Sequence, residues 1–139
     1  MIQPIQFHEH DSIAVIAPHP DDECLGAASA LLMAADRTDI YVLTDGSHGN
    51  PAKTVEEEAA VRKRQFEAEM EYVRPRSWHW LGVEDTKLAS NLRALDDIDF
   101  SGYQYAISGM VHPWGRRLDE EITKLIPIPD SAGSYRDML

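Results

Sequence analysis

Cysteine, positive charge and long apolar runs are scarce in this sequence, and each scarcity excludes a class of protein. With one cysteine among 139 residues, Cys24, the chain can form no internal disulfide and no cysteine cluster for a metal. Asp and Glu number 24 against 13 Lys and Arg, and the formal charge of -11 opposes binding to nucleic acid or to an anionic membrane surface. No apolar stretch approaches the roughly 20 residues that span a bilayer. Any metal site must therefore be built from His, Asp or Glu.

Residues 1–12 also lack the basic and apolar segments of a signal peptide, so we expect a cytoplasmic protein. A chain of this length with 43% hydrophobic residues can bury one ordinary core. This predicts a single domain over residues 1–139, with about 126–139 as a loop or tail. The short chain and its three tryptophans leave room for a homo-oligomer, in which a second copy covers exposed faces.

Short apolar runs alternate with helical patterns along the chain. In the first helical pattern, Leu25, Leu32 and two alanines form an apolar stripe, and Thr54 with Glu57 forms a capping box at the start of the second. The predicted strands are 12–18, 39–46, 77–82 and 103–111, and the predicted helices are 22–36, 55–73, a weaker segment around 88–98, and 116–126. This alternation predicts an α/β fold, a Rossmann-like three-layer sandwich with a mostly parallel central sheet.

A dense polar cluster, His19 with Asp21 and Asp22, directly follows the first predicted strand. In open parallel sheets, ligands bind beyond the carboxyl ends of the strands, where the loops after the other predicted strands also converge. An imidazole and a carboxylate suit zinc, and a second carboxylate beside them can act as a general base. The alternative is that the two aspartates and Glu23 only cap the following helix, while His19 forms a hydrogen bond within the loop.

The segment "APHPDDECLG", residues 17–26, resembles the "AHPDDE-x-x-G" signature of the PIG-L and LmbE-like N-deacetylases. These are zinc-dependent enzymes that remove acetyl groups from N-acetylglucosamine-type sugars. "VLTDG" at 42–46 is similar to the second strand of that family and its loop, and residues 61–82 are similar to its Arg-bearing helix and the strand after it. The similarity spans roughly residues 12–117. It implies a zinc-dependent N-deacetylase acting on a small-molecule N-acetylated sugar or sugar conjugate.

The resemblance also implies roles for five residues. His19 and Asp22 would bind Zn2+, Asp21 would be the general base, and Arg62 and Asp85 would contact the sugar. For Asp85 the alternative is an ordinary turn aspartate.

Arg62 has support that is independent of the family, because it falls four residues before Phe66 on the apolar face of its helix. A charge among core positions needs a partner or a ligand, and a structural ion pair is the alternative to a sugar. The family usually has a Glu three residues after this Arg, where the chain has Gln65. A shifted register would place Arg64 and Glu67 in that role instead.

The third zinc ligand departs from the family pattern. The family presents "HPDHR", in which the second His binds zinc and the first assists the reaction, whereas this chain has "HPWGR" at 112–116. His112 keeps the first position, and Gly115 stands where the metal-binding His is expected. His112 could therefore take the metal as well as a catalytic role, another histidine could substitute, or the metal could be weak or absent. His48, on the loop at 44–49, could reach the metal or the substrate, or be a solvated loop residue.

Two functions follow from these residues. The first is metal-dependent hydrolysis of an N-acetylglucosamine-type amide. The alternative is a catalytically impaired, shortened family member that binds a ligand or a partner without hydrolysis, as the glycine at the third ligand position would suggest. A nucleotide-binding domain is disfavoured, because the first strand is followed by carboxylates rather than by the Gly-x-Gly-x-x-Gly turn that binds phosphate.

Overall fold

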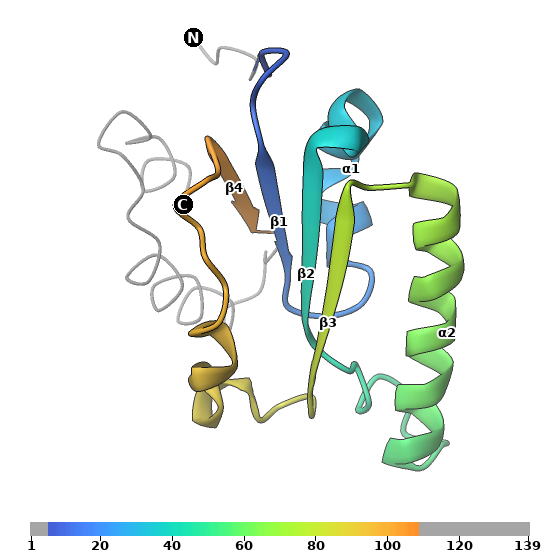
Figure 1. The fold of residues 1–139 in the computed structure, drawn as a ribbon. Coiled ribbons are helices and arrows are strands. Elements are labelled where there is room, and N and C mark those ends of the chain that lie inside the picture. Colours follow the sequence, from blue (N-terminus) through green and yellow to red (C-terminus); the bar gives the residue numbers. More distant parts are fainter. Residues whose placement is uncertain (1–5, 109–139) are drawn as a thin grey trace, which may run out of the picture.

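The structure, a computed structural model, describes residues 6–108, which form a four-stranded parallel sheet with two α-helices (Figure 1). The strand order is β3-β2-β1-β4, and all three strand pairs are parallel. The strands are β1 (Ile13–Ala17), β2 (Thr38–Thr44), β3 (Ser77–Val83) and β4 (Tyr105–Ser108). The helices are α1 (Asp22–Ala34) and α2 (Val55–Val73). The prediction of an α/β fold with a parallel central sheet is confirmed.

The two central strands are buried along their whole length. Every residue of β1 and β2 is buried, because each strand has a neighbour on both sides and both faces of the sheet are covered. Such strands are apolar on both faces, which is why they appear in the sequence as continuous rather than alternating runs. Because these strands are parallel and packed on both sides, the loops after β1, β2 and β3 leave the sheet at the same edge.

Both α-helices cover the same face of the sheet. Leu31 of α1 and Phe66 of α2 belong to one core cluster with Val15 of β1 and Val42 of β2. The other face is covered by residues 88–103, which contain short 3-10 turns at Leu88–Ser90 (η2) and Leu92–Leu95 (η3).

The weak helix that the sequence predicts around residues 88–98 therefore forms two 3-10 turns rather than an α-helix. Between these turns, the side chain of Asn91 donates a hydrogen bond to the backbone oxygen of Lys87 at 2.8 Å. Asn side chains that bond to nearby backbone in this way compete with helical hydrogen bonds. The layer on this face of the sheet is consequently irregular.

The predicted apolar stripe of α1 is wrong. Leu25 and Leu32 are 81% and 89% exposed, whereas Leu31 and the alanines at 27, 30 and 34 are buried against the sheet. The helix has apolar residues on both sides, so periodicity alone does not decide which side is buried. The small side chains face the sheet because they allow the helix to approach it closely. The helix also ends at Ala34, earlier than predicted, and continues as the 3-10 turn η1 (Ala35–Arg37).

The prediction for α2 is confirmed in detail. Thr54 and Glu57 form a reciprocal capping box, in which the Glu57 N–H donates to Thr54 Oγ1 at 3.2 Å and the Thr54 N–H donates to Glu57 Oε2 at 3.0 Å. Phe66 and Met70 lie on the buried face. Arg62 lies one turn before Phe66, on the same side of the helix, and thus points its side chain toward the carboxyl edge of the sheet.

Some predictions fall outside the described residues, among them the helix at 116–126, the tail at 126–139 and His112. Within 6–108, neither α-helix is long and apolar enough to cross a membrane. The cytoplasmic location, the single domain over 1–139 and the homo-oligomer stay predictions.

Candidate active site

The loops after β1 and β2 are joined directly at the carboxyl edge of the sheet, the lower edge in Figure 1. Thr44, the last residue of β2, donates from its N–H at 3.0 Å and from its Oγ1 at 2.7 Å to the backbone oxygen of Pro18. This double contact holds the loop that carries the predicted site residues from 19 to 22. The rigid end of the sheet thus determines where those side chains lie.

His19 lies between two carboxylates. Its Nδ1 is 3.3 Å from Asp22 Oδ2, and its Nε2 is 3.0 Å from Asp85 Oδ1. Asp22 Oδ2 also accepts a hydrogen bond from the His19 backbone N–H at 2.9 Å. The hydrogen bond with Asp22 raises the pKa of His19 above its usual value; burial opposes this rise, and the negative charges of Asp85 and Asp22 add to it. Three residues predicted from the sequence are therefore in contact.

Asp21 is held by hydrogen bonds through both its backbone and its side chain. Its φ of 126° lies outside the regions that L-residues ordinarily occupy. Its N–H donates to Glu23 Oε2 at 3.1 Å, and its Oδ2 accepts from Arg62 Nη2 at 2.9 Å. Arg62 Nη2 also donates to the backbone oxygen of Pro20 at 3.0 Å. The structure thus places Arg62, rather than the exposed Arg64, at this site.

The acidic residues at the start of α1 do not act as simple helix caps. Asp21 occupies the N-cap position but its side chain makes no capping hydrogen bond, and Asp22 bonds to His19 instead. Glu23 is 1% exposed, and burial raises its pKa to about 7. Its Oε1 has no hydrogen-bond partner among the described residues. A buried carboxyl with an unpaired oxygen lowers the stability of the fold. Its presence therefore indicates that these acidic residues serve a function and do not only cap the helix.

Asp45 is a residue of this site that the sequence did not indicate as functional. Its Oδ1 accepts hydrogen bonds from the N–H of Asp85 at 2.9 Å and from the N–H of Ser47 at 3.0 Å. The available signal was its position directly after a buried strand, the same kind of position that His19 and Asp85 occupy. His48, which the sequence did indicate, is partly exposed, and its Nε2 is 3.5 Å from Glu84 Oε1.

Comparisons with known proteins agree with this geometry. The chain matches the family described as PIG-L: GlcNAc-PI de-N-acetylase over residues 14–126. The chain belongs to the PIG-L family. Among solved structures it is similar to N,N'-diacetylchitobiose deacetylase from Pyrococcus horikoshii complexed with its inhibitor MPG, with 26% identity and a TM-score of 0.50. That similarity covers 56% of this chain and 31% of the other, so this PIG-L chain spans less than a third of that enzyme's length. A comparison with curated proteins found no match.

The described donors fit zinc at two positions. His19 and Asp22 supply the nitrogen and oxygen ligands that zinc accepts, and zinc bonds to such atoms are about 2.0–2.2 Å long. Two ligands at tetrahedral angles around one ion are then about 3.3–3.5 Å apart, and His19 Nδ1 is 3.3 Å from Asp22 Oδ2. Within residues 6–108 no group of three or more His, Cys, Asp or Glu is arranged to hold a metal ion. A metal held by His19 and Asp22 would need a third ligand from outside these residues.

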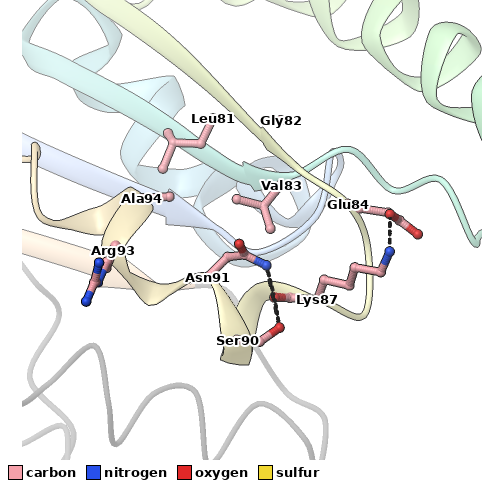
Figure 2. A pocket seen from close by; sticks show the side chains of 9 residues that line it. All are labelled: Leu81, Gly82, Val83, Glu84, Lys87, Ser90, Asn91, Arg93 and Ala94. Atoms are coloured by element: carbon pink, nitrogen blue, oxygen red, sulfur yellow. Dashed lines mark hydrogen bonds and ion pairs between the residues drawn. The ribbon is translucent and has the colours of Figure 1, made fainter.

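A hollow of about 520 Å³ lies on the irregular side of the sheet, at the end of β3 (Figure 2). Its wall includes Glu84 and Lys87, which flank Asp85 in the chain and are themselves paired at 2.5 Å, and it includes the amide of Asn91. The full lining consists of Leu81, Gly82, Val83, Glu84, Lys87, Ser90, Asn91, Arg93 and Ala94. Its size falls in the range of small-molecule sites, and its hydrogen-bonding side chains suit a polar ligand.

Proposed function

We propose that this chain is a metal-dependent hydrolase that removes an acetyl group from an N-acetylglucosamine-type amide. The observation that carries the proposal is the contact between His19 and Asp22 directly beside Asp21, a second carboxylate that Arg62 holds in place. A nitrogen and oxygen donor pair with an adjacent carboxylate is what metal-assisted amide hydrolysis requires. Membership of the PIG-L family supports the same reaction.

His19 and Asp22 are the residues that we propose to hold Zn2+, and His112 or another histidine would be the third protein ligand. When bound, zinc supplies Lewis-acid activation of a carbonyl group and of water. The donor pair is positioned by the sheet rather than by a flexible loop, since Pro18 just before it is bonded to the end of β2. A site positioned in this way keeps its donors in place before the metal arrives.

Asp21 is the proposed general base. Half of its side chain is exposed, so a water molecule and a substrate amide can approach it. It would accept the proton of the attacking water, while the Arg62 guanidinium holds its Oδ2 and fixes the direction of the carboxylate. With another histidine as the third ligand, His112 would stabilise the oxyanion of the tetrahedral intermediate or protonate the leaving amine.

The substrate is proposed to be a small N-acetylated sugar or sugar conjugate, contacted by Arg62, Asp85 and His48. Arg62 Nη2 and Asp85 Oδ1 are already engaged with protein groups, so a sugar hydroxyl would meet their other polar atoms. The hollow lined by Glu84 and Lys87, which are close to Asp85 in the chain, is where we expect the rest of the substrate to lie, since its amide and hydroxyl side chains can bond to sugar hydroxyls.

The experiment is to measure release of a primary amine from N-acetylglucosamine and its conjugates, using protein supplied with zinc. We expect turnover by the natural chain, little turnover by Asp21→Asn, and full turnover by the control Asp36→Asn, which removes an exposed carboxylate at the opposite edge of the sheet. Binding of the sugar without any amine release would contradict hydrolysis and would favour the alternative of a ligand-binding family member.

A further inference from the structure

We propose that Asp85 is a positioning residue that orients the His19 ring, and that Asp45 holds Asp85 in place for this purpose. Neither carboxylate would bind the metal, but the affinity for zinc would depend on both. The inference rests on the proposed function, because it concerns the same site and deepens the account of it.

The His19 ring has a carboxylate beside each of its two nitrogens. Its Nδ1 faces Asp22, the other proposed ligand, while its Nε2 is 3.0 Å from Asp85 Oδ1. A metal-binding histidine usually donates its other ring N–H to a carboxylate or carbonyl, which fixes the tautomer and the direction of the ring. Asp85, whose side chain is only 14% exposed, is placed to be that acceptor. It comes from the end of β3, 66 residues further along the chain.

The backbone turn after Asp85 fixes the direction of its carboxylate. Thr86 has a φ of 72°, an unfavourable value for a β-branched residue, and its N–H donates to Asp85 Oδ1 at 2.8 Å. The same oxygen contacts His19 Nε2, so the local turn and the distant histidine bind one carboxylate atom. Backbone strain of this kind persists where surrounding contacts impose it. The turn therefore directs the Asp85 carboxylate at His19.

Asp45 joins the ends of β2 and β3. Its side chain accepts the N–H of Asp85 at 2.9 Å, and its own N–H donates to the backbone oxygen of Val83 at 2.9 Å. The loops after these strands are thus held together by bonds in both directions. Loss of the Asp45 side chain would free the Asp85 backbone and indirectly the His19 ring.

The test is a measurement of zinc affinity by competition with a chromophoric chelator. For Asp85→Ala we expect affinity to fall about 10-fold to 100-fold, the usual effect of removing an outer partner of a metal ligand. Asp45→Ala should lower affinity in the same direction by a smaller factor. Asp45→Asn should bind zinc like the natural chain, because its amide oxygen can still accept both N–H groups. Asp36→Ala, at the opposite edge of the sheet, is the control and should leave affinity unchanged.

A second measurement works without metal. In metal-free protein at a pH where the His19 ring is neutral, nitrogen NMR should show the proton on Nε2, facing Asp85 at the shorter of the two ring contacts. In Asp85→Ala the ring should populate both tautomers, and Asp85→Asn provides a milder variant if the alanine variant does not fold. An unchanged tautomer in both variants would overturn the inference.

The failure of this inference can be distinguished from the failure of the proposed function. If His19→Ala abolishes zinc binding while Asp85→Ala binds like the natural chain, the positioning role is wrong and the metal site stands. If zinc affinity does not depend on His19 at all, the proposed function fails, and the tautomer measurement decides the positioning role separately.

Discussion

The two edges of the central sheet differ in how fully their buried polar groups are satisfied. At the amino edge, Asp39 near the start of β2 accepts from Arg76 Nε at 2.9 Å and from Arg76 Nη2 at 2.6 Å. Ser77 Oγ at 2.8 Å and Tyr103 OH at 2.6 Å complete the set. Every polar group of this cluster acts on one carboxylate, which is how a structural ion pair is stabilised.

The carboxyl edge shows the opposite balance. Buried polar atoms without a hydrogen-bond partner in the described part of the chain include Glu23 Oε1, Ser47 Oγ and Arg62 Nε, all at this edge. Asp21 and Thr86, with φ of 126° and 72°, add backbone strain there. Unsatisfied groups and strain are retained where function requires them. One edge therefore stabilises the fold, whereas the other holds functional side chains in place at a cost in stability.

The largest effect that this comparison predicts is on catalysis. Asp21→Asn should lower turnover by about 10²-fold to 10⁴-fold, because a general base is lost. The free energy of unfolding should change little, since Asp21 is half exposed and the amide oxygen of Asn can still accept from Arg62 Nη2. Turnover on an N-acetylated sugar and chemical denaturation of the same preparation measure both quantities. A variant that is fully active would show that the strained edge has another purpose.

The next largest effect is on stability at the amino edge. Asp39→Ala should lower the free energy of unfolding by about 2–4 kcal/mol, because the partners of the carboxylate lose their charged acceptor. The loss should lie toward the lower end, since the Arg76 side chain is 41% exposed and water partly replaces the lost contact. Denaturation with urea measures it. Turnover per folded molecule should be unaffected, and a loss of turnover in a stable variant would show that the amino edge also serves catalysis.

A smaller effect concerns the pH dependence of stability. Burial alone raises the pKa of Asp39, but its hydrogen bonds outweigh burial and lower the pKa from 3.8 to about 2. Because the folded pKa is depressed, this stabilisation is complete above about pH 4 and is lost as the pH falls from about 4 to about 2. It amounts to about 1–2 kcal/mol after screening by solvent is considered. Urea denaturation across this range should show a shallower decline in Asp39→Asn, and an identical decline would be contrary to the account.

The smallest effect separates two positive-φ residues. Arg74, with φ of 52°, ends α2, and Thr86 lies beside Asp85. Replacing either with glycine should relieve strain and raise the free energy of unfolding by about 0.5–1 kcal/mol. Thr86→Gly should also weaken zinc binding, because it loosens the turn that directs Asp85, whereas Arg74→Gly should not. Thermal unfolding and chelator competition test the pair, and equal zinc affinities would remove the functional distinction.

Much of the fold could be predicted because local patterns were decisive. The capping box of Thr54 and Glu57 and the polar residues around Phe66 define the start and the buried face of α2. The continuous apolar runs of β1 and β2 indicate strands buried on both faces. In α1, by contrast, the apolar residues surround the helix, so Leu25 and Leu32 could not be distinguished from the buried side by spacing.

The sequence was enough to predict where the candidate site lies, but not which of its side chains contact one another. The topology of a parallel sheet brings the loops after its strands to one edge, which correctly placed His19 and Asp85 near each other. Which atoms meet depends on side-chain directions that are set by tertiary contacts. Arg62 bonding to Asp21 and Asp45 bonding to the Asp85 backbone are examples, since no short-range pattern links those positions.

Elemental analysis of protein purified without chelators, with His19→Ala as the control, measures directly whether the carboxyl edge of the sheet holds a metal. We expect about one zinc per chain in the natural protein and its loss in the variant. No zinc in the natural protein after zinc has been supplied, or the same zinc content in both, would contradict a metal-dependent site at the carboxyl edge of the sheet.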